Sequence, residues 1–321
     1  MSTKDAIAIG LSAAIVSVER ELPSVLVIAR KDEADALPFG PFDPAQHRTL
    51  ELGLHEWVGE QTRFELGYTE QLYTFGDKGR HTQAGGDKAH AKGAQRIISV
   101  GYLALTRQTD AIAPNGEWRG WYRYFPWEDW RGGKPVLIES AILPALRKFV
   151  KDAPNAQAGD TRRERVRLAF GDGLPWDEEK VLERYELLYE AGLVEEYFRD
   201  SGAAVKTSPV SALGTAMLYD HRRIMATAIA RLRGKLKYRP VVFELMAPSF
   251  TLLELQRTVE ALAGLKLHKQ NFRRLVSEQG LVEGTGKFSA PARGRPAELF
   301  RFRREVLRER PAPGLRLGTR R

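Results

Sequence analysis

The side chains best suited to reading DNA lie on one face of a predicted helix, residues 268–279. Successive residues of an α-helix are about 100° apart, so the apolar stripe of this helix centres on Phe272. Its opposite face carries Gln270, Arg273, Arg274 and Ser277. Arg pairs with guanine, and Gln with adenine, through two hydrogen bonds at the base edge. This face is a candidate recognition surface, although a polar outer face is also common to any solvent-exposed helix.

Two neighbouring elements would position that helix on duplex DNA. A preceding helix is predicted at 251–263, with Ser249 or Thr251 as its N-cap and Gly264 just past its end, so the pair forms a helix-turn-helix. After Gly280, strand-like runs at 281–283 and 297–303 predict a hairpin with a basic tip, which is typical of a wing. The other predicted DNA contacts are Thr251, Lys269, Lys287, Arg293 and Arg295.

The charge distribution favours the same interpretation. Residues 211–321 contain 23 Lys and Arg but 9 Asp and Glu, a net charge of +14, whereas the whole chain has a net charge of +9. A basic surplus confined to one segment is typical of a protein that binds a polyanion. A solvated basic tail is the alternative, since residues 301–321 alone hold eight Arg.

The first half of the chain predicts a mixed α/β domain. Apolar runs at 6–18 and 24–29 flank a turn and predict an antiparallel hairpin. A Pro- and Gly-rich loop leads to a helix predicted at 48–62, and further strands are predicted at 65–75 and 96–105. A polar, Gly-rich loop joins those two strands.

Seven aromatic side chains crowd residues 118–130, and Trp121 is among them. Burial in a core or a domain interface is the usual role of such a cluster, and stacking on the bases of single-stranded RNA is the alternative. A helix is predicted at 141–152, a linker at 152–159 and a long helix at 176–198. A further helix is predicted at 220–237, with Arg222, Arg233 and Lys237 on the face opposite its apolar stripe. The predicted domains are a sensing domain at 1–154, a helical linker region at 155–210 and a DNA-binding domain at 211–321.

The composition of the chain excludes several classes of protein. It contains no cysteine, which excludes disulfides, thiolate metal sites and cysteine nucleophiles. No run of about 18 apolar residues is present, and the N-terminus does not have the pattern of a signal peptide. The expected location is the cytoplasm.

Two sets of motifs resemble the Nudix-related transcriptional regulators of NAD metabolism, which include the NrtR-like and NadQ-type repressors. The motifs are residues 72–77 and 97–105 in the first half, and 271–274 and 294–297 near the end. The resemblance implies an N-terminal Nudix-like α/β/α sandwich followed by a C-terminal winged helix-turn-helix. It also implies a homodimer that represses NAD biosynthesis genes by binding double-stranded operator DNA. The implied effector is NAD(H), ATP or an ADP-ribose-like nucleotide.

The Nudix box, which holds catalytic Mg²⁺ in hydrolases of this fold, is incomplete in this sequence. With its end anchored at Phe64, Trp57 and Gln61 stand where carboxylates are needed, and Glu60 is the one acid retained. A shift of one residue gains Glu56 but loses other positions, so neither alignment supplies the full ligand set. We therefore expect a sensor without catalytic residues, metal or catalytic cofactor. An active ADP-ribose pyrophosphatase with an accessory nucleic-acid domain is the alternative.

The sensing residues are predicted from the same resemblance together with charge. Arg48 replaces an acid of the box and would suit a phosphate, and Arg96 begins a strand on the expected ligand side. The full set of predicted ligand contacts is Arg48, Glu60, Phe75, Asp77, Arg96 and Tyr102. Each has a structural alternative, such as Phe75 in the core or Arg96 at a solvated edge.

Overall fold

The computed structural model describes residues 7–29, 34–64, 66–77, 96–107, 116–203, 213–289, 296–310 and 312–315. Two predicted DNA contacts, Arg293 and Arg295, lie outside these residues, as does most of the Gly-rich loop after residue 77. Arg96 is described only as the first residue of a strand.

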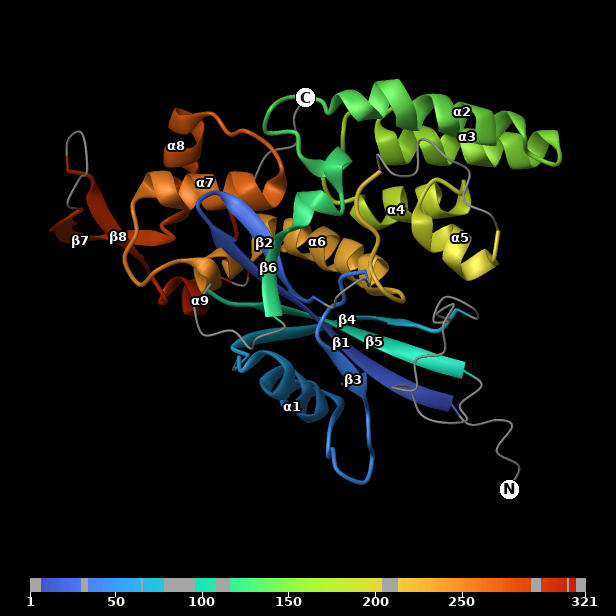
Figure 1. The fold of residues 1–321 in the computed structure, drawn as a ribbon. Helices are drawn as coiled ribbons and strands as arrows, with labels where there is room; N and C mark the ends of the chain where they lie inside the picture. Colours follow the sequence, from blue (N-terminus) through green and yellow to red (C-terminus); the bar gives the residue numbers. More distant parts are fainter. Residues whose placement is uncertain are drawn as a thin grey trace.

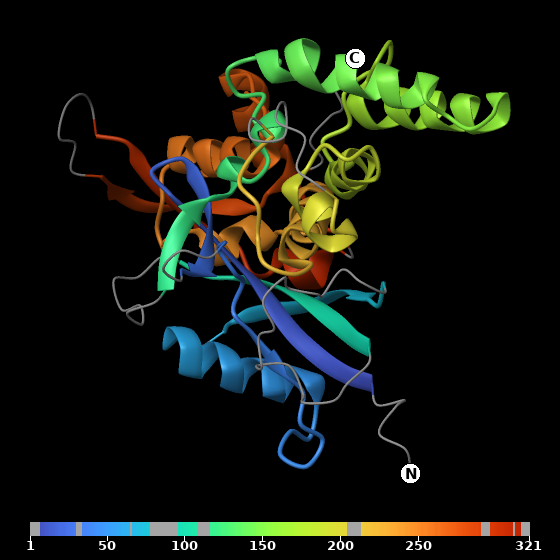
Figure 2. The ribbon, with the colours of Figure 1, turned by 45° about the vertical axis from the view of Figure 1, so that its right-hand side comes forward.

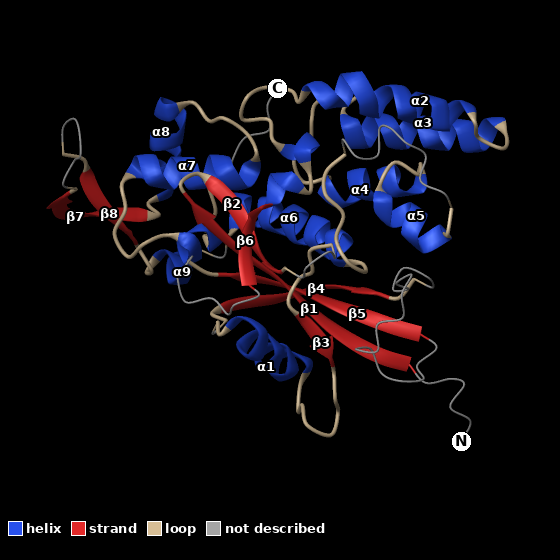
Figure 3. Cartoon of the chain, viewed as in Figure 1, coloured by secondary structure: helices blue, strands red, loops and turns tan. Residues whose placement is uncertain are grey.

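A mixed six-stranded sheet forms the base of the N-terminal half (Figures 1 and 3). β1 (Ile7–Glu19) and β2 (Leu22–Ile28) form the predicted antiparallel hairpin. Arg20 and Glu21 both have positive φ, as a tight two-residue turn between twisted strands requires. β1 also pairs in parallel with β5 (Arg96–Leu105), and β5 pairs antiparallel with β4 (Tyr68–Phe75). The short β3 (Phe39–Pro41) pairs with β1, and β6 (Gly116–Gly120) pairs with β2.

Helices cover both faces of this sheet (Figure 1). On one face α1 (Leu50–Thr62) buries Leu54 and Val58 against Leu11 and Ile15 of β1. On the other face α6 (His221–Tyr238) contacts β1, β4 and β5, and its Ile224 belongs to the larger core cluster. The predicted α/β/α sandwich is confirmed. The helix α6, which covers the second face of the sheet, lies within the range predicted for the C-terminal DNA-binding domain, 211–321.

The aromatic segment, residues 118–130, is part of the hydrophobic core. Trp121, Tyr124, Phe125 and Trp127 have no exposed surface. The single-strand stacking alternative is therefore wrong for Trp121, because a buried indole cannot stack on a base.

The middle of the chain differs from the prediction. α2 (Leu143–Lys151) matches the helix expected at 141–152, but the expected linker at 152–159 runs into α3 (Ala156–Phe170). Asn155 caps α3 by accepting a hydrogen bond from the Ala158 amide. The sequence prediction missed α3 because its exposed, polar residues give it little apolar periodicity. α2 and α3 project from the rest of the molecule (Figure 2).

The single helix predicted at 176–198 is wrong. Two helices occupy this region, α4 (Val181–Glu190) and α5 (Glu195–Ser201). Gly192 separates them with φ of 66°, a conformation that ends a helix.

The C-terminal elements agree closely with expectation. α7 (Leu252–Ala263) and α8 (Lys269–Gln279) are followed by the hairpin of β7 (Val282–Phe288) and β8 (Glu298–Phe302), then by α9 (Val306–Glu309). The hairpin lies at one end of the molecule, away from the large sheet (Figure 3). Within the described part of the chain, no helix combines the length and apolar character needed to cross a membrane.

Candidate functional sites: a surface pocket and a nucleic-acid interface

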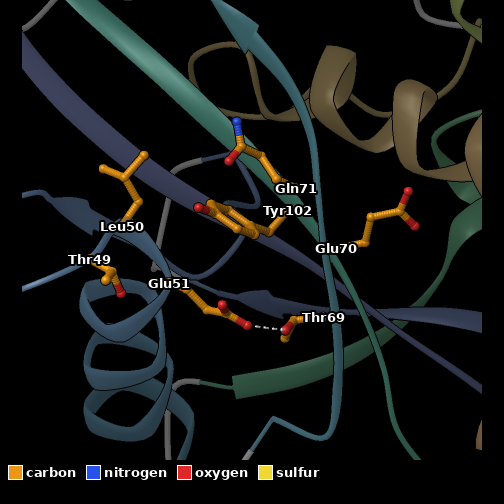
Figure 4. A pocket seen from close by; sticks show the side chains of 7 residues that line it. All are labelled: Thr49, Leu50, Glu51, Thr69, Glu70, Gln71 and Tyr102. Atoms are coloured by element: carbon orange, nitrogen blue, oxygen red, sulfur yellow. Dashed lines mark hydrogen bonds between the residues drawn. The ribbon is translucent and has the colours of Figure 1, made fainter.

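A pocket of about 330 Å³ opens where the first turn of α1 faces β4 and β5. Figure 4 shows the side chains around it. The lining residues are Thr49, Leu50, Glu51, Thr69, Glu70, Gln71 and Tyr102. Local structure explains this arrangement. Thr49 is the N-cap of α1, which brings Glu51 into the first turn, and successive residues of β4 point to opposite faces of the sheet.

The pocket is lined by hydrogen-bonding groups rather than by cations. Glu51 Oε1 accepts a hydrogen bond from Thr69 Oγ1 at 2.8 Å. Tyr102 is 4% exposed, and burial together with the nearby Glu51 carboxylate raises the pKa of its phenol. No Lys or Arg is among the described residues that line it. Carboxylate and hydroxyl oxygens of this kind suit sugar hydroxyls and exocyclic amino groups.

One of the six predicted ligand contacts, Tyr102, lies in the pocket wall. Arg48 and Glu60 are exposed, and neither is a lining residue. Phe75 is 1% exposed and packs beneath the Arg223 guanidinium at 4.8 Å, while Asp77 forms an ion pair with Arg223. These two side chains join β4 to α6. A ligand role for the five residues outside the lining stays a prediction.

Sequence reasoning missed the other members of the pocket. Thr49 and Glu51 belong to the start of α1, Thr69 and Gln71 belong to β4, and these residues face one another only in the folded chain. The available signal was weak. It was the position of Glu51 in the first turn of a predicted helix and the polar residues of an expected strand.

Two residues of α1, the helix that contains the expected Nudix box, make structural contacts with β3. Trp57 Nε1 donates to Pro41 O at 2.8 Å. Gln61 accepts from the Phe39 amide at 3.1 Å and donates to Phe39 O at 2.6 Å. Trp57 lies directly on β3, since a Cβ added at Gly40 would come within 2.1 Å of its ring. Trp57 and Gln61, which the expected box alignment places where a hydrolase needs carboxylates, therefore hold β3 in this structure.

The described residues contain no group of three or more His, Asp or Glu side chains that could hold a metal ion. His47 contacts Glu56 at 3.2 Å and accepts from the Asp43 amide, so this histidine braces the loop before α1. Glu60, the retained acid of the box, is exposed.

The C-terminal helices present the predicted recognition face. Phe272 and Val276 are buried, whereas Lys269, Gln270, Arg273, Arg274 and Ser277 are exposed. In the preceding helix, Thr251 forms a capping box. Its hydroxyl accepts from the Glu254 amide, and the Glu254 carboxylate accepts from the Thr251 amide. The Thr251 hydroxyl thus has a structural role, and its contact with DNA stays a prediction.

The wing is a separate two-stranded sheet. β7 and β8 pair antiparallel from Val282–Phe302 to Phe288–Glu298, and Lys287 is exposed on β7. Phe302 stacks on Phe243 at 4.3 Å, which anchors the base of the hairpin. The exposed cations of α8 and the wing thus belong to neighbouring elements that rest on a common core.

The turn between α7 and α8 is docked on the aromatic segment. The Tyr122 hydroxyl donates to Ala261 O at 2.7 Å, and the Trp130 amide donates to Gly264 O at 2.8 Å. Gly264 has φ of 71°, and an added Cβ would lie 2.4 Å from Glu128 O. Glycine is required at this turn both by its conformation and by this close approach.

A buried charge cluster lies beneath the same turn. Glu128 has no exposed side-chain surface and accepts from Arg184 at 2.6 and 2.9 Å and from Arg233 at 2.6 Å. Burial opposes ionisation of Glu128, but the two guanidinium groups outweigh it and hold the pKa of the carboxyl below its usual range. Arg233 also donates to Leu262 O at the end of α7. The cluster therefore joins α4, α6, the aromatic segment and the helix-turn-helix.

Comparison with known sequences agrees with this C-terminal architecture. Residues 242–302 match the family model for the NrtR DNA-binding winged helix domain. A curated relative from Acinetobacter baylyi, the ADPR responsive transcriptional repressor NtrR, is 43% identical over 91 residues. These residues are 28% of this chain and 36% of the relative, so the match spans about a third of that protein's length.

Solved structures resemble the fold of nearly the whole chain. Shewanella oneidensis NrtR in complex with a 27mer DNA has a TM-score of 0.52 and 19% identity, covering 93% of this chain and 94% of the other. A MutT/nudix family protein from Enterococcus faecalis has a TM-score of 0.50 and 14% identity, covering 93% and 87%. The fold of the chain is therefore similar to that of these proteins, with an α/β/α sandwich and a winged helix-turn-helix whose residues 242–302 match the NrtR type.

Proposed function

We propose that this protein is a cytoplasmic, homodimeric transcriptional repressor that binds duplex operator DNA and responds to ADP-ribose or a related NAD-derived nucleotide. The observation that carries the proposal is the exposed Gln270–Arg273–Arg274–Ser277 face of α8 beside a wing, in a segment that matches an NrtR-type winged helix. The matched relative is an ADPR responsive transcriptional repressor, which supports both repression and a response to ADP-ribose. NAD biosynthesis genes are the proposed targets.

The proposed ligand site is the pocket between α1 and β4. The Glu51 carboxylate and the hydroxyls of the pocket would bind the ribose hydroxyls or the adenine amino group of a nucleotide. The diphosphate would extend out of the pocket, because the Glu51 carboxylate inside it would repel phosphate charge. Arg48, which is exposed one residue before the helix cap, is the proposed phosphate partner.

The experiment that tests this function measures how a nucleotide changes DNA binding. A duplex is first selected by the protein from a random library, and its affinity is then measured with ADP-ribose, NAD, NADH or ATP at increasing concentrations. We expect ADP-ribose to change the affinity for the duplex by about 5- to 150-fold, a typical range for coupling between two sites. Equal affinity at every ADP-ribose concentration would contradict the proposed regulation.

A second expectation concerns catalysis. Trp57 and Gln61 occupy positions where Mg²⁺ ligands are needed and are engaged with β3, so purified protein is expected to cleave neither ADP-ribose nor NADH in a Mg²⁺-dependent way. The measurement is product formation over hours, with an active Nudix hydrolase as the positive control. Robust turnover that disappears in Glu60→Gln would favour the alternative function, an active pyrophosphatase.

A further inference from the structure

β4 faces the proposed ligand pocket with one side and α6 with the other. Thr69 and Gln71 point toward the pocket, and Glu70 points away from it (Figure 4). The Glu70 carboxylate lies 2.6 Å from Lys235 Nζ and 3.3 Å from Arg231 Nη1, and both cations belong to α6. Tyr68, two residues earlier, accepts from Lys235 at 2.9 Å and donates to Glu70 at 2.9 Å.

The opposite side of α6 contacts the helix-turn-helix. Arg233 is about 200° around the helix from both Arg231 and Lys235, so it points the other way. Its side chain has no exposed surface and donates to Leu262 O at 3.0 Å and to the Glu128 carboxylate at 2.6 Å. In Figure 1 α6 lies between the large sheet and α7. A single helix therefore holds the pocket strand on one side and the end of α7 on the other.

We propose that α6 is the element that couples the pocket to the recognition helix, and that Glu70 is the residue through which β4 acts on it. The inference rests on the proposed function and names how the same site regulates DNA binding. A ligand that hydrogen-bonds Thr69 and Gln71 displaces β4, and the Glu70 ion pairs transmit that displacement to α6. Because Arg233 is buried and fully hydrogen-bonded, α6 cannot shift without moving the end of α7. Packed interiors transmit displacement in this way because they are dense and poorly compressible.

The two acids of the pocket region provide a matched pair of variants. Glu70→Gln removes the charge that faces α6, whereas Glu51→Gln removes a charge that faces the pocket and contacts Thr69. For each protein the dissociation constant of a selected duplex is measured without ADP-ribose and at saturating ADP-ribose. The ratio of the two constants is the coupling factor, and ADP-ribose affinity is measured separately by calorimetry.

In Glu70→Gln we expect the coupling factor to fall close to 1 at saturating ADP-ribose. In Glu51→Gln we expect weaker ADP-ribose binding but a coupling factor equal to that of the wild type. Reciprocity provides a second readout, because operator DNA must change ADP-ribose affinity by the same factor. That effect should be present in the wild type and lost in Glu70→Gln.

A wild-type coupling factor in Glu70→Gln would overturn the inference while leaving the proposed function intact. A wild type that neither binds ADP-ribose nor responds to it would refute the proposed function, and the inference with it. If Glu70→Gln fails to fold, Arg231→Gln tests the same contact, since Arg231 is 45% exposed and its loss spares the buried cluster. Arg231→Gln should lower the coupling factor, and an unchanged factor in this variant would also overturn the inference.

Discussion

Replacing Glu128 with glutamine is expected to lower the free energy of unfolding by about 3–5 kcal/mol, the usual effect of breaking a buried ion pair by removing one partner. Arg184 and Arg233 have no exposed side-chain surface and share this one carboxylate. Glutamine can keep part of the hydrogen bonding, but it leaves two buried positive charges without a counter-charge. The loss follows from that uncompensated charge more than from the altered shape of the side chain.

Urea unfolding at neutral pH measures this effect, with Glu164→Gln as the control. Glu164 forms an exposed pair with Arg167, and such surface pairs contribute at most about 1 kcal/mol. Similar unfolding midpoints for Glu128→Gln and the wild type would contradict the expectation.

The contribution of Glu128 also depends on pH, with a definite sign. The folded-state pKa of this carboxyl lies below its unfolded value, which is about 4.3 for a glutamate. Its stabilisation is therefore complete above the unfolded pKa and is lost as pH falls through the folded-state pKa. The stability difference between wild type and Glu128→Gln should narrow as the solution is acidified below about pH 4.

Replacing Arg274 with alanine is expected to weaken binding to the selected duplex by about 1–3 kcal/mol, or roughly 5- to 150-fold. The Arg274 side chain is 72% exposed, and its nearest carboxylate, Glu278, is 3.8 Å away, so the guanidinium is free to form two hydrogen bonds with a guanine. Most of this loss should be confined to the selected duplex, so that the preference for it over other sequences falls. Affinity for an unrelated duplex should change much less, because only the base contact carries sequence information.

Two variants separate base reading from general charge attraction. Lys287→Ala in the wing should weaken binding to all duplexes about equally. It should also reduce the slope of log affinity against log salt concentration by about the contribution of one phosphate contact. Arg163→Ala removes an exposed arginine from α3, outside the winged helix, and should leave specific binding unchanged. Fluorescence anisotropy at several salt concentrations measures all three. Equal losses for Arg274→Ala on the selected and unrelated duplexes would remove Arg274 from the set of base-reading residues.

The recognition helix could be predicted from sequence because its information is local. The spacing of Phe272 and Val276 determines which side of α8 is buried, and that assigns Arg273 and Arg274 to the opposite face. Gly264 ends α7 and Gly280 ends α8, and each has the positive φ that is typical of a glycine at the C-terminal end of a helix. The hairpin of β1 and β2 was equally accessible, since it depends on neighbouring residues and one short turn.

The proposed ligand pocket depended on the tertiary structure because its residues come from three separate segments of the chain. Pairing of β4 with β5 brings Thr69 opposite Ala104 and Gln71 opposite Tyr102, and α1 then adds Glu51. The same pairing leaves Phe75 and Asp77 at the end of β4, where Arg223 of α6 engages both. The sequence predicted Tyr102, Phe75 and Asp77 alike as ligand contacts, because no local pattern separates a pocket residue from a residue that joins β4 to α6.

The buried cluster around Glu128 gives the same lesson for charge. In the sequence Arg233 is one of many cations in a basic segment, and its helix was expected to present it on an outer face. The folded chain instead buries Arg233 beside Glu128 and Arg184. Glu128 is 105 residues from Arg233 and 56 residues from Arg184 in the sequence. Local periodicity determines secondary structure and the exposed DNA-reading face, whereas only long-range packing decides which charges are buried, paired and able to link the two halves of the protein.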